Sequence, residues 1–257
     1  MESFVTHQIR KSIGLLAIVI AVGGSGLLPT AAAQESDAFG WSITPYIWAP
    51  NTTVDLTVRD TNIGSGEISF KDLLDTLDAA FMVQVEGGKG KWSGFGDLTY
   101  LKTSDTNERT VFTIDIDSEQ IYLDAAVAYW PDGVGSPLSL FGGLRFSGFD
   151  ETYRFSLNNG TPVSETPSGE DYYDALFGLR YRFDMSERWQ LLTHGDFSFG
   201  DSEGTFLLRA NFGYIVGKRQ QNRILFGYQY KSAEYREGDL TKDFTMHGPM
   251  AGFDFRF

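Results

Sequence analysis

The chain ends in GFDFRF, in which phenylalanine alternates with a charged residue. Successive side chains of a β-strand point to opposite faces, so the three phenylalanines would share one face and the two charged residues the other. The same alternation recurs at 174–183, 206–216 and 226–231. The pattern therefore predicts strands that are apolar on one face and polar on the other.

Further segments alternate less regularly. They are 41–49, 80–88, 91–103, 111–130, 138–156 and 188–200. Within 111–130 the apolar residues change phase, and we expect a β-bulge near Asp117 or Ser118, because one extra residue reverses the two faces. With the C-terminal segment, the alternation predicts ten strands.

The connections between these strands differ in length. Most are short and rich in turn residues, whereas 50–79, 104–110, 157–170 and 233–243 are mostly longer and polar. Short turns on the periplasmic side and longer loops on the extracellular side are typical of outer-membrane barrels. Because backbone polar groups inside a membrane must be paired, such a sheet closes on itself. The sequence predicts an all-β fold, a closed antiparallel transmembrane β-barrel of about ten strands, with eight or twelve as alternatives.

Aromatic residues favour this fold over a soluble β-sandwich. Tryptophans fall at the predicted periplasmic ends of strands, at Trp41, Trp92, Trp130 and Trp189. Tyrosines and phenylalanines gather near the opposite ends, at Tyr100, Tyr122, Tyr173, Phe199, Phe206 and Tyr230. Two aromatic girdles of this kind border the apolar band of a transmembrane barrel, which is about 25 Å tall.

The N-terminus has the three parts of a secretory signal peptide. Arg10 and Lys11 precede an apolar run, and small residues follow it. We expect residues 1–33 to be the signal peptide, cleaved after Ala33, and residues 34–257 to be the barrel domain. The chain has no cysteine, so disulfide and thiolate chemistry are excluded. These features predict a location in the outer membrane of a Gram-negative cell.

The charge is strongly acidic. The chain has 21 basic and 34 acidic side chains, a net charge of −13, which argues against nucleic acid as a partner. The short periplasmic turns are predicted to hold a basic excess that includes Arg188 and Arg223, so the acidity is concentrated in the extracellular loops. Calcium or magnesium could bridge these carboxylates to lipopolysaccharide phosphates. We therefore expect outer-membrane lipids and lipopolysaccharide as partners, loose divalent-cation binding at the loops, and no other cofactor.

Charged residues on the polar faces would line the lumen. They are Glu86, Asp97, Asp124, Asp174, Asp196 and Asp254, with Arg145, Arg180, Arg182, Arg209, Lys231 and Arg256. A barrel of about this size has an interior only slightly wider than its side chains need. Six acids and six bases in so narrow a space predict a network of ion pairs. A narrow passage between these charges is the alternative.

Two other segments could carry function. Ser69 and Asp72 form a capping-box-like start for a short helix at 69–78, which we expect at the rim of the first extracellular loop rather than as a plug. His194, Asp196 and Ser198 share one predicted face, so a base, an orienting carboxylate and a nucleophile could be proposed there. Because such neighbours arise by chance along any strand, a structural role for them is favoured.

The C-terminal phenylalanines have a second possible role. A terminal aromatic residue that closes an alternating last strand resembles the sorting signal that outer-membrane proteins present to the barrel-assembly machinery. The residues of this predicted assembly signal are Phe253, Phe255 and Phe257.

Residues 41–105 resemble a family of uncharacterised Gram-negative outer-membrane β-barrel proteins, small and porin-like. The resemblance lies in ITPYIWAP, in FKDLLDTLDAAFMVQVEGGKGKW and in FGDLTYLKTSD, which give an early Pro-Tyr-x-Trp, a leucine-rich acidic segment and a Gly/Lys turn before tryptophan. The resemblance implies the barrel fold and its location, and no activity.

The sequence thus predicts an outer-membrane barrel without enzymatic activity, with a structural or surface-interaction role. A narrow porin for small solutes is the first alternative, and an outer-membrane lipid-modifying enzyme is the second.

Overall fold

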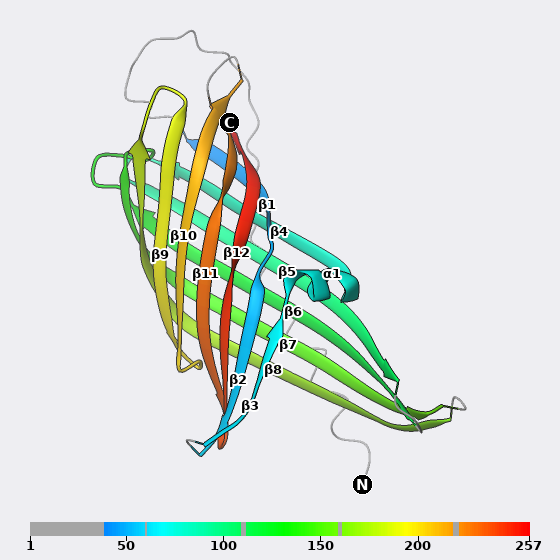
Figure 1. The fold of residues 1–257 in the computed structure, drawn as a ribbon. Helices are drawn as coiled ribbons and strands as arrows, with labels where there is room; N and C mark the ends of the chain where they lie inside the picture. The colour runs from blue at the N-terminus through cyan, green and yellow to red at the C-terminus, as the bar shows by residue number, and fades with distance from the viewer. Residues whose placement is uncertain (1–38, 60, 109–111, 159–160, 218–220) are drawn as a thin grey trace. The chain divides into compact units, whose positions relative to one another are not determined.

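The computed structural model describes residues 39–59, 61–108, 112–158, 161–217 and 221–257 (Figure 1). The predicted signal peptide and its cleavage site lie outside these residues. The described elements are β1 (Gly40–Trp48), β2 (Asn51–Val58), β3 (Thr61–Ile68), α1 (Phe70–Thr76), β4 (Leu77–Lys89), β5 (Trp92–Glu108), β6 (Phe112–Tyr129), β7 (Leu138–Leu157), β8 (Pro162–Asp184), β9 (Trp189–Gly200), β10 (Gly204–Val216), β11 (Asn222–Glu237) and β12 (Leu240–Arg256). No helix among the described residues is long and apolar enough to cross a membrane.

Ten of the strands close into an antiparallel barrel. Strands β4 to β12 each pair with the next along the chain, and β1 joins the two ends by pairing with both β4 and β12. Ile43 of β1 lies opposite Val85 on one side and Phe255 on the other. Figure 1 shows β12, in red, beside β1, in blue. The predicted closed all-β barrel of ten strands is confirmed.

Strands β2 and β3 are additional to the barrel and occupy much of the predicted loop 50–79. Strand β2 continues β1 along β12 in the same register, with Trp48 opposite Met250 and then Asn51 opposite His247. The pairing of β4 with β1 ends at Pro45, which has no backbone N–H to donate to the ladder. Beyond Trp48, β2 takes the place of β1 beside β12, and the other edge of β2 pairs with β3 and not with β4.

Several predicted loops are strand. Segments 104–110, 157–170 and 233–243 lie largely within β5, β8, β11 and β12. Strand β8 has 23 residues, about twice the number that a strand needs to cross a membrane. The predicted bulge near Asp117 is wrong, because β6 pairs with β5 and β7 without a register shift. The apolar residues change phase there because the strand extends beyond the apolar belt. Outside the belt, alternation no longer indicates which face of the strand points outward.

The outer face of the barrel carries an apolar belt. Its side chains point away from the lumen and are exposed in the isolated chain, and they include Leu140, Leu144, Phe177, Leu179, Phe197, Leu208, Phe212 and Phe226. Trp41, Trp92 and Trp189 are exposed at one edge of this belt. Trp130 differs, because it packs against an interior cluster and its Nε1 donates to Ser93 Oγ at 2.8 Å. The periplasmic girdle therefore holds three of the four predicted tryptophans.

Helix α1 starts as predicted. Ser69 Oγ accepts from the backbone N of Asp72, and the Asp72 carboxylate accepts from the Ser69 backbone, which is a complete capping box. The helix contacts β5, and none of its residues is buried. This position fits the predicted rim helix rather than a plug.

Candidate functional site

The lumen brings the predicted charged residues together. None of the twelve is exposed, and Arg145, Asp174, Asp196, Lys231 and Asp254 are buried. Polar side chains gather here because side chains alternate along each strand: the apolar ones point outward and the polar ones point into the lumen. The lumen is therefore the candidate functional site.

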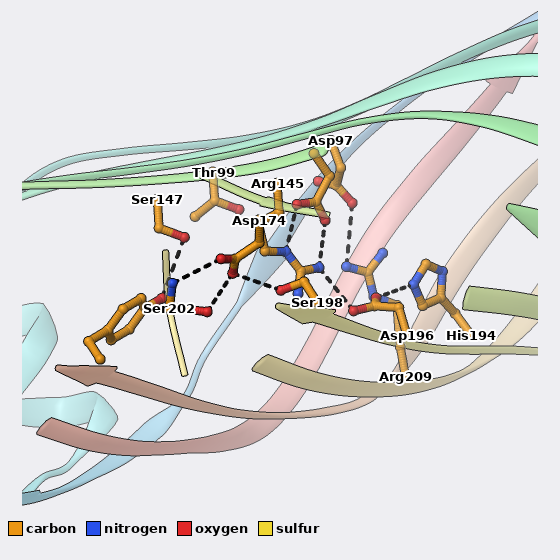
Figure 2. Close-up of polar contacts among 12 residues, drawn as sticks. Asp97, Thr99, Arg145, Ser147, Asp174, His194, Asp196, Ser198, Ser202 and Arg209 are labelled. Carbon is orange, nitrogen blue, oxygen red and sulfur yellow. Dashed lines mark hydrogen bonds and ion pairs between the residues drawn. The ribbon is translucent and has the colours of Figure 1, made fainter. Parts of the chain in front are cut away.

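Arg145 is the centre of the network. Its Nε and Nη2 donate to the two carboxylate oxygens of Asp124 at 2.7 and 2.8 Å, a bidentate pair between neighbouring residues of β6 and β7. The same Nη2 lies 3.0 Å from Asp196 Oδ1 on β9. The Arg145 side chain is 2% exposed, so one buried guanidinium holds two carboxylates (Figure 2).

His194 belongs to this network. Its Nε2 lies 2.6 Å from Asp196 Oδ2, and its Nδ1 accepts from Arg180 Nε at 3.3 Å. Ser198 instead donates to Asp174 Oδ2 at 3.0 Å, and Ser202 binds the same carboxylate. The nucleophile and base that the sequence allowed are thus held by different partners, and Ser198 has no hydrogen bond with His194 among the described contacts (Figure 2).

Several contacts cross the full width of the lumen. Arg209 on β10 pairs with Asp97 on β5 at 3.5 Å, and these strands lie on opposite walls because they are five places apart in the ten-strand ring. The Tyr46 hydroxyl donates to the same Asp97, at 2.7 Å, from β1, which is two places from β5 in the ring and not opposite it. The Lys231 ammonium on β11 lies 3.8 Å from the ring centroid of Tyr122 on β6, again across the ring.

A further set lies toward the end of the barrel that carries the short turns. Arg180 Nη1 donates to Glu86 at 2.8 Å, and its guanidinium lies 3.8 Å from the Phe95 ring centroid. Arg182 pairs with Asp184 at 3.0 Å, and Arg256 pairs with Asp254 at 2.8 Å. The predicted lumen residues therefore form several ion-paired groups along the barrel.

Sequence reasoning missed an aromatic cluster at the extracellular end. It consists of Phe149, Tyr172, Tyr235 and Phe244, with Ala233. Phe149 on β7 lies 5.2 Å from Tyr235 on β11 and 6.4 Å from Phe244 on β12, measured between ring centroids. Tyr235 lies within the predicted loop 233–243 and Phe244 directly follows it, so the sequence predicts no inward-facing strand position for either.

Arg223 is a second correction. The sequence placed it in a periplasmic turn, whereas it lies in β11 with its side chain 8% exposed and facing the lumen. The alternation of Ile224, Phe226 and Tyr228 on the outer face already gives Arg223 the inner face, as it does Gln229. A predicted strand that began at Arg223 would have placed this side chain in the lumen.

Metal ligands are not clustered in the described part of the chain. No group of three or more histidine, aspartate or glutamate side chains there is arranged to hold a metal ion. The loose cation binding expected at the extracellular loops stays a prediction.

Comparisons with known proteins agree on the fold. No family model matches the chain, and a search of curated proteins gave no match. The solved structure of the outer-membrane protease OmpT from Escherichia coli is similar, with a TM-score of 0.53 and 10% identity over 88% of this chain and 99% of that one. Weaker likenesses include Ail, the attachment invasion locus protein of Yersinia pestis, with a TM-score of 0.39, 10% identity and coverage of 84% of this chain and 98% of Ail.

The toluene transporter TodX of P. putida is another weak likeness, with a TM-score of 0.31, 8% identity and coverage of 86% of this chain and 90% of TodX. At such identities the likeness to OmpT concerns the fold alone. The closed ring of strands, the outward apolar belt and this likeness lead to one conclusion: the chain has the fold of a Gram-negative outer-membrane β-barrel.

Proposed function

We propose that the protein is an integral outer-membrane barrel with a closed lumen, which anchors and presents a surface structure in the Gram-negative envelope. The observation that carries this proposal is the set of contacts between opposite walls of the lumen. Arg209 to Asp97 and Lys231 to Tyr122 each span the ring, and the Phe149 cluster spans it again at the extracellular end.

A solute that passed through would have to separate these groups. Removing one partner of a buried ion pair costs about 3–5 kcal/mol, because the other charge stays buried without compensation. Besides the Arg209–Asp97 ion pair, the contact of Lys231 with the Tyr122 ring and the Phe149 cluster lie across the lumen. Passive passage is therefore a less favourable function for this lumen than a structural one.

The strands that extend beyond the apolar belt support the surface role. Strands β5 to β8, β11 and β12 continue outward into segments rich in polar and acidic residues. This arrangement would place a rigid, acidic sheet surface outside the membrane. Outer-membrane lipids and lipopolysaccharide are the proposed surroundings, and the exposed Phe257 beside Phe255 suits recognition by the barrel-assembly machinery.

Recording of single channels in planar bilayers tests the proposal. The wild-type protein should give no stable conductance steps, whereas a variant carrying both Asp97→Ala and Arg209→Ala should conduct. A matched variant, Asp117→Ala with Arg154→Ala, removes an ion pair outside the lumen and should stay silent. Reproducible steps from the wild type would contradict the closed lumen and favour the narrow porin.

We also propose that the protein is not an enzyme. In support, Ser198 is engaged by Asp174, and His194 lies within the ion-paired lumen. Profiles of lipid A and phospholipids from cells with and without the protein test this. An altered acyl pattern that disappears in the His194→Ala variant would contradict it.

A further inference from the structure

A cavity of about 150 Å³ lies in the part of the lumen beside the β6–β7 turn. It is partly open and is bordered by Ser136 and Pro137 of that turn and by strands from most of the ring. Its charged lining is dominated by arginine, namely Arg180, Arg182, Arg209, Arg223 and Arg256, with Glu86 and Asp254. By topology this cavity faces the periplasm, since the short turns and the C-terminus lie at this end.

The arginines of the cavity outnumber their carboxylates. Four of the five have a carboxylate within 3.5 Å: Glu86 for Arg180, Asp184 for Arg182, Asp97 for Arg209 and Asp254 for Arg256. Arg223 is the fifth. Among the described residues its one ion pair is with Asp254 Oδ2, at 3.9 Å, and this oxygen already accepts from Arg256.

A buried donor beside the cavity also lacks an acceptor. The Arg223 side chain is 8% exposed, so little water can solvate its guanidinium. Arg180 Nη2 is buried and has no hydrogen-bond partner among the described residues. A buried cation without a close counter-charge is unfavourable, and a bound anion would supply both the charge and the acceptors.

We propose that this cavity binds a small oxyanion, with phosphate chemistry, from the periplasmic side. Guanidinium groups recognise phosphate oxygens through paired N–H donors, and Arg223 and Arg180 both line the cavity with spare donor capacity. The hydroxyl of Ser42 borders the same space and could contribute a further donor. The site requires no passage through the lumen, so it is independent of whether the barrel conducts.

Calorimetric titration of the purified full-length barrel in neutral detergent tests the site. The probe is inorganic phosphate at constant ionic strength in chloride. The wild type should bind one phosphate saturably, and Arg223→Gln should weaken binding about tenfold or more, the effect of losing one charge-assisted hydrogen bond. Arg236→Gln is the matched control, because Arg236 lies at the other end of the same strand, is half-exposed and pairs with Glu203 at 3.1 Å.

Two further measurements separate folding and ligand source from binding. Heat-modifiable mobility on gels shows whether each variant has folded, and Arg223→Lys, which keeps the charge without the fork of donors, should bind with intermediate affinity. In nanodiscs, phosphatidylglycerol that is retained by the wild type but not by Arg223→Gln would identify a lipid headgroup as the source of the phosphate. If the wild type and Arg223→Gln bind both probes equally, the proposal is overturned.

Discussion

Arg145 is the residue on which the lumen network depends most. Its guanidinium compensates Asp124 and Asp196, and the Asp196 side chain is 1% exposed. Arg145→Met should lower the free energy of unfolding by about 3–5 kcal/mol, because two carboxylates remain buried without a counter-charge. Urea unfolding in lipid vesicles measures the change. Arg154→Met, at a half-exposed extracellular pair, should cost less than about 1 kcal/mol; equal losses for the two variants would show that burial does not decide the cost.

The outward-facing residues allow a second test on a single strand. Leu179 lies in the apolar belt of β8, and Val163 is an exposed residue of β8 outside the belt, where the pairing with β7 shifts register. Leu179→Arg should cost roughly 2–4 kcal/mol near the membrane midplane, whereas Val163→Arg should be close to neutral. Tryptophan fluorescence during urea titration in vesicles compares them. If Leu179→Arg unfolds at the wild-type urea concentration, the position assigned to the membrane is wrong.

At the residue scale, the alternation of faces predicted which side chains point into the lumen, but it did not predict which of them pair with one another. It put Asp97 and Arg209 on inner faces, where their side chains lie, although they are 112 positions apart. It could not pair them, because a contact across the lumen depends on the closure of the ring and the tilt of the strands. The alternation also applied to Arg223 and Trp130, but their places at strand ends led to their assignment to a turn and to the outer girdle.

Among the elements, α1 depends on its cap rather than on burial. It has seven residues, and none is buried. Ser69→Ala should therefore increase amide exchange in α1 roughly fivefold while the unfolding midpoint of the barrel stays unchanged. Hydrogen-exchange mass spectrometry measures both regions. A lowered barrel midpoint would mean that the helix supports the barrel wall.

The same cap gives α1 a pH dependence. Hydrogen bonds from Ser69 lower the pKa of the Asp72 carboxyl below its ordinary value. A lowered pKa stabilises the folded form above the unfolded pKa, about 4, and this contribution is lost as the pH falls through the folded value. Protection of α1 from exchange, corrected for the intrinsic rate, should thus decrease only in strong acid, and Asp72→Asn should remove this step.

The elements that the sequence missed lie outside the apolar belt. Strands β2 and β3 lie in a segment that the sequence predicts to be a loop. Val54, Leu56 and Val58 of β2 alternate with polar residues, but β3 shows no such alternation. Lipid imposes strict alternation on a strand, whereas water on both faces removes this constraint. Ile114 and Ile116 illustrate the same limit: β6 has no bulge, so they lie on the same face of the strand as Asp124.

At the scale of the whole molecule, charge is distributed unevenly between the two ends. The cavity at the periplasmic end is rich in arginine, whereas the extended strands bring carboxylates together. Glu119 of β6 lies directly opposite Asp150 of β7, and Asp171 of β8 repels the same group. Partial burial, then Asp171 and Glu119, raise the pKa of the Asp150 carboxyl. The ionised cluster therefore destabilises the folded barrel at neutral pH.

This repulsion predicts how the barrel responds to protons and divalent cations. Because the folded pKa of Asp150 is raised, the folded state gains stability as the pH falls through that folded value toward the unfolded pKa, about 4. Millimolar calcium should raise the thermal unfolding midpoint at neutral pH for the same reason, since carboxylate oxygens are good calcium ligands. Asp150→Asn should raise the calcium-free midpoint and reduce the calcium effect. Asp239→Asn, which breaks the exposed pair with Arg59, should change neither the calcium-free midpoint nor the calcium effect. Circular dichroism measures the thermal unfolding midpoint with calcium and with chelator. A midpoint that changes with neither would contradict the prediction and show that these carboxylates are merely solvated.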